Sequence, residues 1–278
     1  MTAPLLAVED LRVRFHLRTG TVEAVRGVSF ALGRERLGIV GESGSGKSQT
    51  GRAILGLTPP PGEVTAKRLQ FDGVDHLTAS KRQLRNLRGG RISMVMQDPK
   101  YSLNPVMTIG EQIIEAYRAH VPASRSQARE KALFMLESVK MRDPARVFSL
   151  YPHEVSGGMG QRAMIAMMLV TDPDLLIADE PTSALDVTVQ MEVLNILDGL
   201  VAERGMGLIF ISHDLKLVSS FCNRVLVMYA GRIVEEIEAR RLGQGQHPYT
   251  QGLLRCLPTL RDDVHPLPTL QRDPTWAQ

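Results

Sequence analysis

Apolar and polar residues follow two different periods along this chain. Alternation of apolar and polar residues, which is typical of half-buried strands, marks residues 7–15 and 22–32. Elsewhere, short apolar runs and amphipathic segments follow one another. We predict buried strands at 36–40, 91–96, 174–179 and 207–212, a hairpin at 224–238, and helices at 48–57, 109–120, 126–139 and 187–205. Strands that alternate with helices predict an α/β fold with a mainly parallel sheet.

Two segments depart from this alternation. Between about residues 98 and 162 the apolar residues have helical spacing only, so we predict a helical insertion there. From residue 241 to 278 the chain is rich in proline and shows little periodicity, so we expect an irregular, mobile tail. The predicted organisation is a main domain over residues 1–240, which contains the insertion, followed by a C-terminal tail.

The composition is that of an ordinary globular protein and argues against several classes. Of the 278 residues, 33 are Lys or Arg and 30 are Asp or Glu, a mild balance that argues against a nucleic-acid partner. The basic run at 80–91 is broken by leucines and is typical of a solvated helix face. Cys222 and Cys256 are too few for a disulfide framework or a four-thiolate metal site. The N-terminus does not resemble a signal peptide, and the longest apolar run, AMIAMMLV, is far shorter than the roughly 20 residues that span a bilayer.

The strongest chemical motif is GESGSGKS at residues 41–48, which matches the phosphate-loop pattern GxxxxGK[ST] at every fixed position. A predicted strand precedes it and a predicted helix follows, so backbone N–H groups and the helix N-terminus converge on phosphate oxygens. Lys47 supplies a charge for the β- and γ-phosphates, and Ser48 offers a hydroxyl to Mg²⁺. By itself the loop specifies a nucleotide and nothing narrower. The expected nucleotide contacts are Gly41, Glu42, Ser43, Gly44, Ser45, Gly46, Lys47, Ser48 and Gln49.

An acidic pair ends the buried strand in LLIADE. Asp179 and Glu180 therefore lie at the carboxyl edge of the predicted sheet, where ligands bind in open α/β folds. Asp179 is expected to hold the Mg²⁺ shell. Glu180 is expected to position or deprotonate the attacking water.

A second stretch with phosphate-binding character, VSGGMGQR at residues 155–162, lies at the far end of the predicted insertion. Because residues 41–48 already hold the chain's own nucleotide, we expect the second stretch to meet the γ-phosphate of a nucleotide on another copy or a partner. The Ser156 hydroxyl, the N–H groups of Gly157 and Gly158 and the following helix would contact it. On these residues alone, a plain glycine-rich helix start is the alternative.

Taken in order, the motifs resemble those of ATP-binding cassette (ABC) ATPases over about residues 5–260. They are GESGSGKS, Gln97 in MVMQDP, VSGGMGQR as the signature stretch, LLIADEP, SALD at 183–186, and ISHD with His213. The resemblance implies a RecA-like phosphate-loop core with an antiparallel β subdomain and an inserted helical subdomain. It also implies an ATPase that uses ATP and Mg²⁺, with two ATP molecules held between two such chains.

The resemblance also implies roles for single residues. Phe15 would stack on adenine, although a strand residue of the core is an equal reading, and Asp186 would cross the dimer interface. His213 would contact the γ-phosphate, where a polar cap at a strand end is the alternative. Gln97 would sense Mg²⁺ and the attacking water. The implied catalytic group is then Glu180, His213, Gln97 and Lys47, and the implied Mg²⁺ group is Ser48, Gln97 and Asp179.

Within the family, QDPKYSLNPVMTIGEQI, ADEPTSALDVTVQ and HPYT at 247–250 look like the ATPase subunits of oligopeptide, dipeptide and nickel importers. That likeness implies a peripheral protein on the cytoplasmic side of the inner membrane. Its expected partners are a second, related ATPase subunit, two transmembrane permeases and an extracytoplasmic solute-binding protein. The alternative is an ABC ATPase of a non-transport complex, either of the phosphonate-breakdown kind or one acting on nucleic acid or ribosomes. The sequence does not specify the cargo.

Two departures from the family pattern bear on these expectations. Gly160 replaces a basic residue that the signature usually carries, and glycine inside a helix costs about 1 kcal/mol relative to a good helix former. Many relatives carry a cysteine cluster in a longer tail, whereas the tail here has only Cys256. We therefore expect no iron–sulfur cluster.

Overall fold

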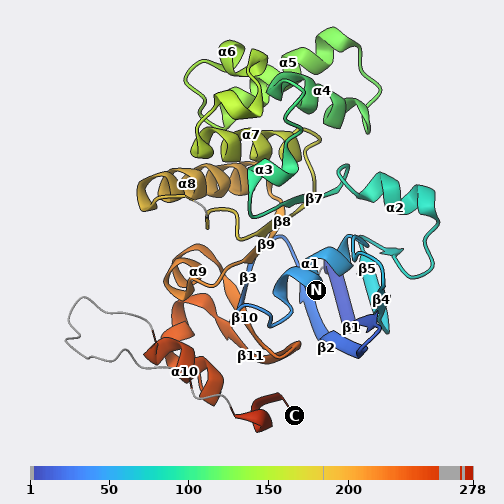
Figure 1. The fold of residues 1–278 in the computed structure, drawn as a ribbon, viewed down its shortest axis with the longest axis vertical. Coiled ribbons are helices and arrows are strands. Elements are labelled where there is room, and N and C mark those ends of the chain that lie inside the picture. Colours follow the sequence, from blue (N-terminus) through green and yellow to red (C-terminus); the bar gives the residue numbers. More distant parts are fainter. Residues whose placement is uncertain (1–2, 184, 257–269, 271–272, 278) are drawn as a thin grey trace. The chain divides into compact units, whose positions relative to one another are not determined.

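The computed structural model describes residues 3–183, 185–256, 270 and 273–277 (Figure 1). The chain divides into two compact units. The first unit is Met1–Ala79 with Ile209–Gln278, and the second is Ser80–Leu208. The chain passes from the second unit into the first within strand β9, Gly207–Ile211.

An antiparallel sheet in the first unit is built around strand β1. The strand β1 (Leu6–Leu17) pairs antiparallel with β2 (Gly20–Leu32), β4 (Gly62–Thr65) and β5 (Arg68–Phe71), and β5 pairs with the short β6 (Val74–Asp75). The alternation that predicted β1 and β2 places one face of each strand inside, so that the paired Val13 and Val25 are fully buried. The short strands β4 to β6 were not predicted.

The remaining strands of the first unit carry the phosphate loop. The strand β3 (Arg36–Val40) runs parallel to β10 (Arg224–Tyr229), which pairs antiparallel with β11 (Arg232–Glu238). Strand β3 is followed by helix α1 (Lys47–Ile54), and β9 is followed by helix α9 (Leu215–Phe221). The predicted hairpin is confirmed. Its turn contains Ala230 and Gly231, both with positive φ.

The C-terminal tail is more regular than expected. It contains 3₁₀-helix η2 (Ala239–Gln244), helix α10 (Pro248–Arg255) and 3₁₀-helix η3 (Pro274–Ala277). The prediction of an irregular tail is wrong for α10, because Pro248 occupies its first turn and the His247 ring accepts a hydrogen bond from the Tyr249 N–H at 3.2 Å. Residues 257–269, 271–272 and 278 of the predicted tail lie outside the described residues.

The second unit combines two strands with most of the helices (Figure 1). Strand β7 (Ile92–Val95) runs parallel to β8 (Leu175–Asp179), and Val95 lies opposite Ala178. The segment between these strands folds into helices only, as far as it is described, and they surround a core that includes Ala128, Ala132 and Met135. The helices of this unit are α2 (Lys81–Leu87), α3 (Pro99–Ser102), α4 (Ile109–Arg118), α5 (Arg125–Ser138), α6 (Pro144–Ser149), η1 (Pro152–Glu154), α7 (Gly157–Leu169) and α8 (Val187–Arg204).

Local sequence explains where several of these helices begin. At α5 the Ser124 hydroxyl accepts from the Gln127 N–H at 3.2 Å, while the Gln127 side chain accepts from the Ser124 N–H at 2.9 Å. Helix α2 starts in the same way at Ser80, and Leu87 is its buried residue, which confirms the solvated basic helix expected there. Over the described residues, none of the helices is both long and apolar enough to span a membrane.

Candidate functional site

The phosphate loop, residues 41–48, leaves β3 and enters α1 in a conformation that requires glycine. Gly41 has φ +150° and Gly46 has φ +102°. A Cβ on Gly46 would lie 2.5 Å from the Ala24 carbonyl oxygen, and one on Gly41 would collide with the Met228 carbonyl. The loop is therefore curled tightly between β2 and β10, and Gly46, as the N-cap, has no side chain to occupy the first N–H groups of α1.

Lys47 is held inside this loop. Its side chain is buried, and Nζ donates to the carbonyl oxygens of Gly41 at 2.8 Å and Glu42 at 2.9 Å. Within the described residues, the buried Ser45 hydroxyl finds no hydrogen-bond partner. A buried ammonium, a hydroxyl with unused capacity and a helix N-terminus lacking a side-chain cap together fit a polyphosphate ligand.

Two further predicted residues lie in the same unit. His213 follows β9, and the Ser212 N–H donates to the Ile39 carbonyl of β3 at 3.1 Å, so His213 emerges beside the strand that leads into the phosphate loop. The cap of α9 is Asp214, which accepts from the Leu217 N–H at 3.0 Å, whereas His213 is exposed. His213 is therefore not the N-cap of α9, and both readings of it given above remain predictions.

Phe15 lies near the end of β1 and is only half-buried. It pairs with Val22 of β2 and Gly62 of β4, and its ring edge would lie 2.9 Å from a Cβ on Gly62. The missing side chain at position 62 lets the aromatic ring lie close over β4. The ring is therefore supported on one side and partly accessible to solvent, a geometry compatible with stacking on a base.

In the second unit, the carboxyl ends of β7 and β8 bring three predicted residues to one edge. Gln97 is exposed and follows β7 by two residues. Asp179 ends β8 with its side chain largely buried, and Glu180 follows at intermediate exposure. Because β7 and β8 are parallel and in register, both strands end at the same edge of the sheet.

Glu180 adopts a strained backbone conformation. Its φ is +48°, in the left-handed region that costs a non-glycine residue about 1–2 kcal/mol. The turn behind it is fixed by Ser183, whose N–H and hydroxyl donate to the Glu180 carbonyl at 3.3 and 3.2 Å. Gln161 of α7, almost fully buried, donates from Nε2 to the Pro181 carbonyl. Gln161 had not been predicted as a site residue. Gln161 lies within residues 155–162, but no feature of the sequence there indicates that its side chain contacts the turn after Glu180.

The signature stretch, residues 155–162, begins helix α7. Ser156 is the exposed N-cap, and its hydroxyl accepts from the Met159 N–H at 3.3 Å. A Cβ on Gly158 would lie 2.5 Å from Val189 Cγ1, so glycine lets α7 approach α8 closely. Asp186 caps α8 by accepting from the Val189 N–H at 3.0 Å, and it too is exposed. Ala184, within the predicted SALD loop, lies outside the described residues.

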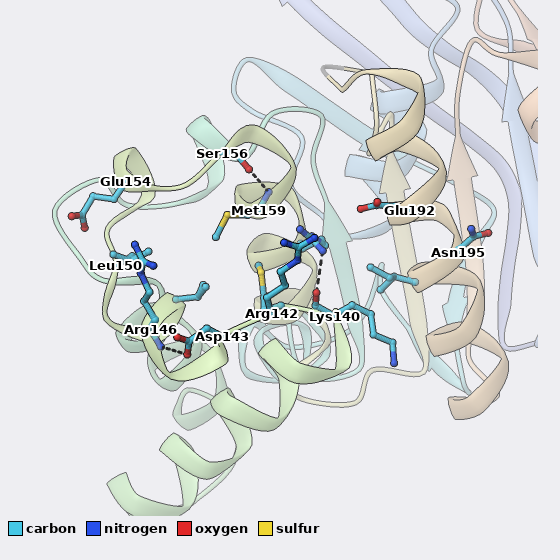
Figure 2. Close-up of a pocket in the computed structure, with 14 residues that line it drawn as sticks. Lys140, Arg142, Asp143, Arg146, Leu150, Glu154, Ser156, Met159, Glu192 and Asn195 are labelled. Atoms are coloured by element: carbon cyan, nitrogen blue, oxygen red, sulfur yellow. Dashed lines mark hydrogen bonds between the residues drawn. The ribbon is translucent and has the colours of Figure 1, made fainter.

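Figure 2 shows a groove of about 890 Å³ beside Ser156, bordered by α6, α7 and α8. Its charged residues are of both signs. Arg162 bonds the Lys140 carbonyl at 3.1 Å, and Glu154 accepts from the Tyr151 N–H at 2.8 Å. The cationic residues that line the groove are Lys140, Arg142, Arg146 and Arg162, and the acidic ones are Asp143, Glu154 and Glu192. The cations therefore outnumber the carboxylates near the signature serine.

Metal-ligand groupings and the two cysteines were considered as further sites. In the described ranges no three His, Cys, Asp or Glu side chains are grouped to hold a metal ion. Cys222 and Cys256 are free thiols, and burial raises the pKa of Cys222 to about 12.

Most of this chain is similar in sequence to known proteins. The family model described as "ABC transporter" matches residues 25–183. A putative peptide import ATP-binding protein of Brucella abortus is 47% identical over 271 residues, which cover 97% of this chain and 82% of the relative. The dipeptide transport ATP-binding protein DppD of Escherichia coli is 45% identical over 268 residues, 96% of this chain and 82% of the relative. The oligopeptide transport ATP-binding protein OppD of Salmonella typhimurium is 47% identical over 272 residues, 97% and 81% respectively.

Solved structures lead to the same family. A dimeric ATP-binding cassette in a post-hydrolysis state with ADP and Pi has a TM-score of 0.75 and 25% identity, and the match covers 84% of this chain and 99% of that one. A cassette of Clostridium perfringens, part of the cbiONQ transporter complex, has a TM-score of 0.73 and 25% identity over 87% of this chain and 92% of that one. The predicted fold class and family resemblance are confirmed: this chain belongs to the ABC transporter family and is one of its ATPases.

Proposed function

We propose that this chain is the ATP-hydrolysing subunit of an importer for peptides or a related solute. The observation that carries the proposal is the identity of 45–47% to peptide, dipeptide and oligopeptide import ATP-binding proteins over at least 96% of the chain. Two stretches with phosphate-binding geometry, residues 41–48 and 155–162, support it.

The phosphate loop holds the chain's own ATP. Backbone N–H groups of residues 41–48 and the Lys47 ammonium bind the phosphates, Gln49 lies in the first turn of α1, and Phe15 stacks on the base. Ser48 and Asp179 would hold Mg²⁺, which would supply charge neutralisation at the phosphates. The fit rests on the curled loop and the buried side chains of Lys47 and Asp179.

Hydrolysis depends on the residues at the strand edges. Glu180 orients the attacking water and accepts its proton, and its strained turn fixes the carboxylate's direction. Gln97 would contact the same water and a ligand of the bound Mg²⁺, and His213 would donate a hydrogen bond to the γ-phosphate. The products are ADP and inorganic phosphate.

The signature stretch serves the ATP of a second ATPase chain. Ser156, Gly157 and Asp186 are exposed, so a partner's nucleotide has access to them. The excess of cations lining the neighbouring groove (Figure 2) favours the approach of a polyphosphate. Closure of two chains around two ATP molecules would then drive the permeases.

The partners follow from this arrangement. We infer a peripheral subunit on the cytoplasmic face of the membrane. It pairs with a related ATPase chain and binds two permeases, which work with an extracytoplasmic solute-binding protein. The mild balance of 33 Lys and Arg against 30 Asp and Glu argues against a nucleic-acid partner.

The test is affinity purification of the tagged chain from detergent-solubilised membranes, with mass spectrometry of what is retained. We expect two permeases and a second ATPase subunit, and the Lys47→Ala variant should retain the same set, because assembly does not require nucleotide. Retention of ribosomal proteins, or of a soluble complex without permeases, would contradict the proposal.

A further inference from the structure

The C-terminal helix α10 reaches the phosphate loop through one tyrosine. The Glu42 N–H donates to the Tyr249 hydroxyl at 2.9 Å, although the two residues are 207 positions apart. Both belong to the first unit, and Tyr249 is fully buried. A backbone N–H buried without a partner is costly, so this hydroxyl satisfies an otherwise difficult position at the start of the loop.

The two peptide units on either side of the Glu42 Cα both hold Lys47. The Gly41 carbonyl, in the same peptide unit as the Glu42 N–H, accepts from Lys47 Nζ at 2.8 Å. While the Glu42 N–H is bonded to Tyr249, its carbonyl accepts from Lys47 Nζ at 2.9 Å and from the Ser45 N–H at 3.2 Å. A rotation of this residue's backbone would displace both the ammonium and the first turn of the loop. Tyr249 thus limits rotation at the point on which the phosphate-binding groups depend.

Tyr249 is itself held from three directions. Its ring lies 4.5 Å from that of Tyr229 and 5.9 Å from that of Trp276, centroid to centroid. The Glu235 carboxylate of β11 accepts from the N–H groups of Gln246 at 2.6 Å and His247 at 3.2 Å, which anchors the start of α10. These contacts give the tyrosine one fixed position.

We propose that Tyr249 is a positioning residue for ATP binding. It orders the phosphate loop before nucleotide arrives, and the aromatic cluster of Tyr229, Tyr249 and Trp276 links the C-terminal segment to the nucleotide site. The inference rests on the proposed assignment of residues 41–48 to ATP. In Sequence analysis, HPYT at 247–250 only indicated a resemblance to importer ATPases. The inference adds that its tyrosine orders the phosphate loop.

Tyr249→Phe removes the hydroxyl and keeps the ring. In the purified full chain, the KM for ATP should rise roughly threefold to tenfold, as the loss of one hydrogen bond predicts, while kcat changes less than about twofold. Hydrogen exchange at the Glu42 amide should accelerate in the variant. The matched control is Tyr229→Phe, since the Tyr229 hydroxyl makes no hydrogen bond among the described residues. This control should leave both measurements unchanged.

Trp276 provides a second readout, because it is the chain's single tryptophan. ATP binding should change its emission in the wild-type chain, and Tyr249→Phe should move the titration midpoint by the same factor as KM. An unchanged Glu42 exchange rate with an unchanged KM would overturn the inference. Lys47→Ala separates the positioning role from the proposed function. If Lys47→Ala binds ATP normally, the proposed function fails. If Lys47→Ala weakens ATP binding but Tyr249→Phe changes neither KM nor Glu42 exchange, only the positioning role fails.

Discussion

The phosphate loop and the signature stretch have similar compositions but are built in opposite ways. In residues 41–48, glycines take positive φ, the lysine is buried, and neighbouring strands leave no room for a side chain at Gly41 or Gly46. In residues 155–162, Ser156 has an ordinary extended backbone, caps its own helix and is exposed. The fold therefore holds residues 41–48 in a fixed conformation, whereas residues 155–162 place an exposed serine at the start of a helix.

This difference indicates how a glycine-rich sequence acts. A loop enclosed by its own fold can bind phosphate alone, because its donors are fixed before the ligand arrives. An exposed helix start has one hydroxyl and a few N–H groups, and it needs an opposing surface to exclude water. The difference is what we expect if residues 41–48 hold the chain's own nucleotide and residues 155–162 contact the nucleotide of a partner, as proposed.

Glu180→Gln should produce the largest effect and leave both stretches intact. Removal of the group that takes the water's proton should lower steady turnover by at least about 100-fold, while the affinity for ATP changes less than about twofold. Phosphate release and nucleotide titration measure the two quantities. Glu203→Gln, at an exposed position on α8, is the control that should keep wild-type turnover. Normal turnover in Glu180→Gln would remove this residue from its role.

Ser156→Arg tests whether the signature stretch serves another chain. Alone, it should reduce turnover by roughly 100-fold, as loss of an electrostatic donor does, without weakening ATP binding to its own phosphate loop. In the absence of the related subunit, when the purified chain pairs with itself, an equal mixture with Lys47→Ala should recover roughly a quarter of the wild-type rate, since half of the randomly formed pairs contain one intact site.

The control for this mixing experiment is Ser149→Arg, an exposed position on α6 that should retain activity alone. No recovery in the Ser156→Arg and Lys47→Ala mixture, with both variants folded, would mean that each chain completes its own site.

Gly160→Ala should produce the smallest effect and separates the two glycine roles within the signature stretch. A Cβ at Gly160 would meet its nearest side-chain atoms at 3.7 Å, an ordinary contact, so alanine should raise the free energy of unfolding by about 0.5–1 kcal/mol. Gly158→Ala should instead destabilise the chain, because its Cβ would collide with Val189. Thermal unfolding of both variants measures the difference, and equal shifts would contradict the packing argument.

Much of the fold was predictable because its signals are local. The compact run at 36–40 coincides with β3, and the alternation at 224–238 with the β10–β11 hairpin. Strands β4 to β6 are two to four residues long, too short to show a period. Helix α10 depends on burial of Tyr249 and Thr250, which no local pattern reveals.

The site was predictable to a similar extent. Motif spacing placed Asp179 and Glu180 at a strand end, where the structure has them, and parallel pairing explains why Gln97 emerges at the same edge. The roles of these residues remain predictions. The bonds from Gln161 to Pro181 and from Glu42 to Tyr249 join distant parts of the sequence, so only the folded chain shows them.

The left-handed backbone at Glu180 has an evolutionary consequence. A glycine at this position would relieve the conformational penalty and make the turn easier to form. Selection for a robust fold alone would therefore drift toward glycine and erase the carboxylate. A carboxylate in a turn that glycine would form more easily is what we expect if this position serves the proposed reaction and not only the stability of the fold.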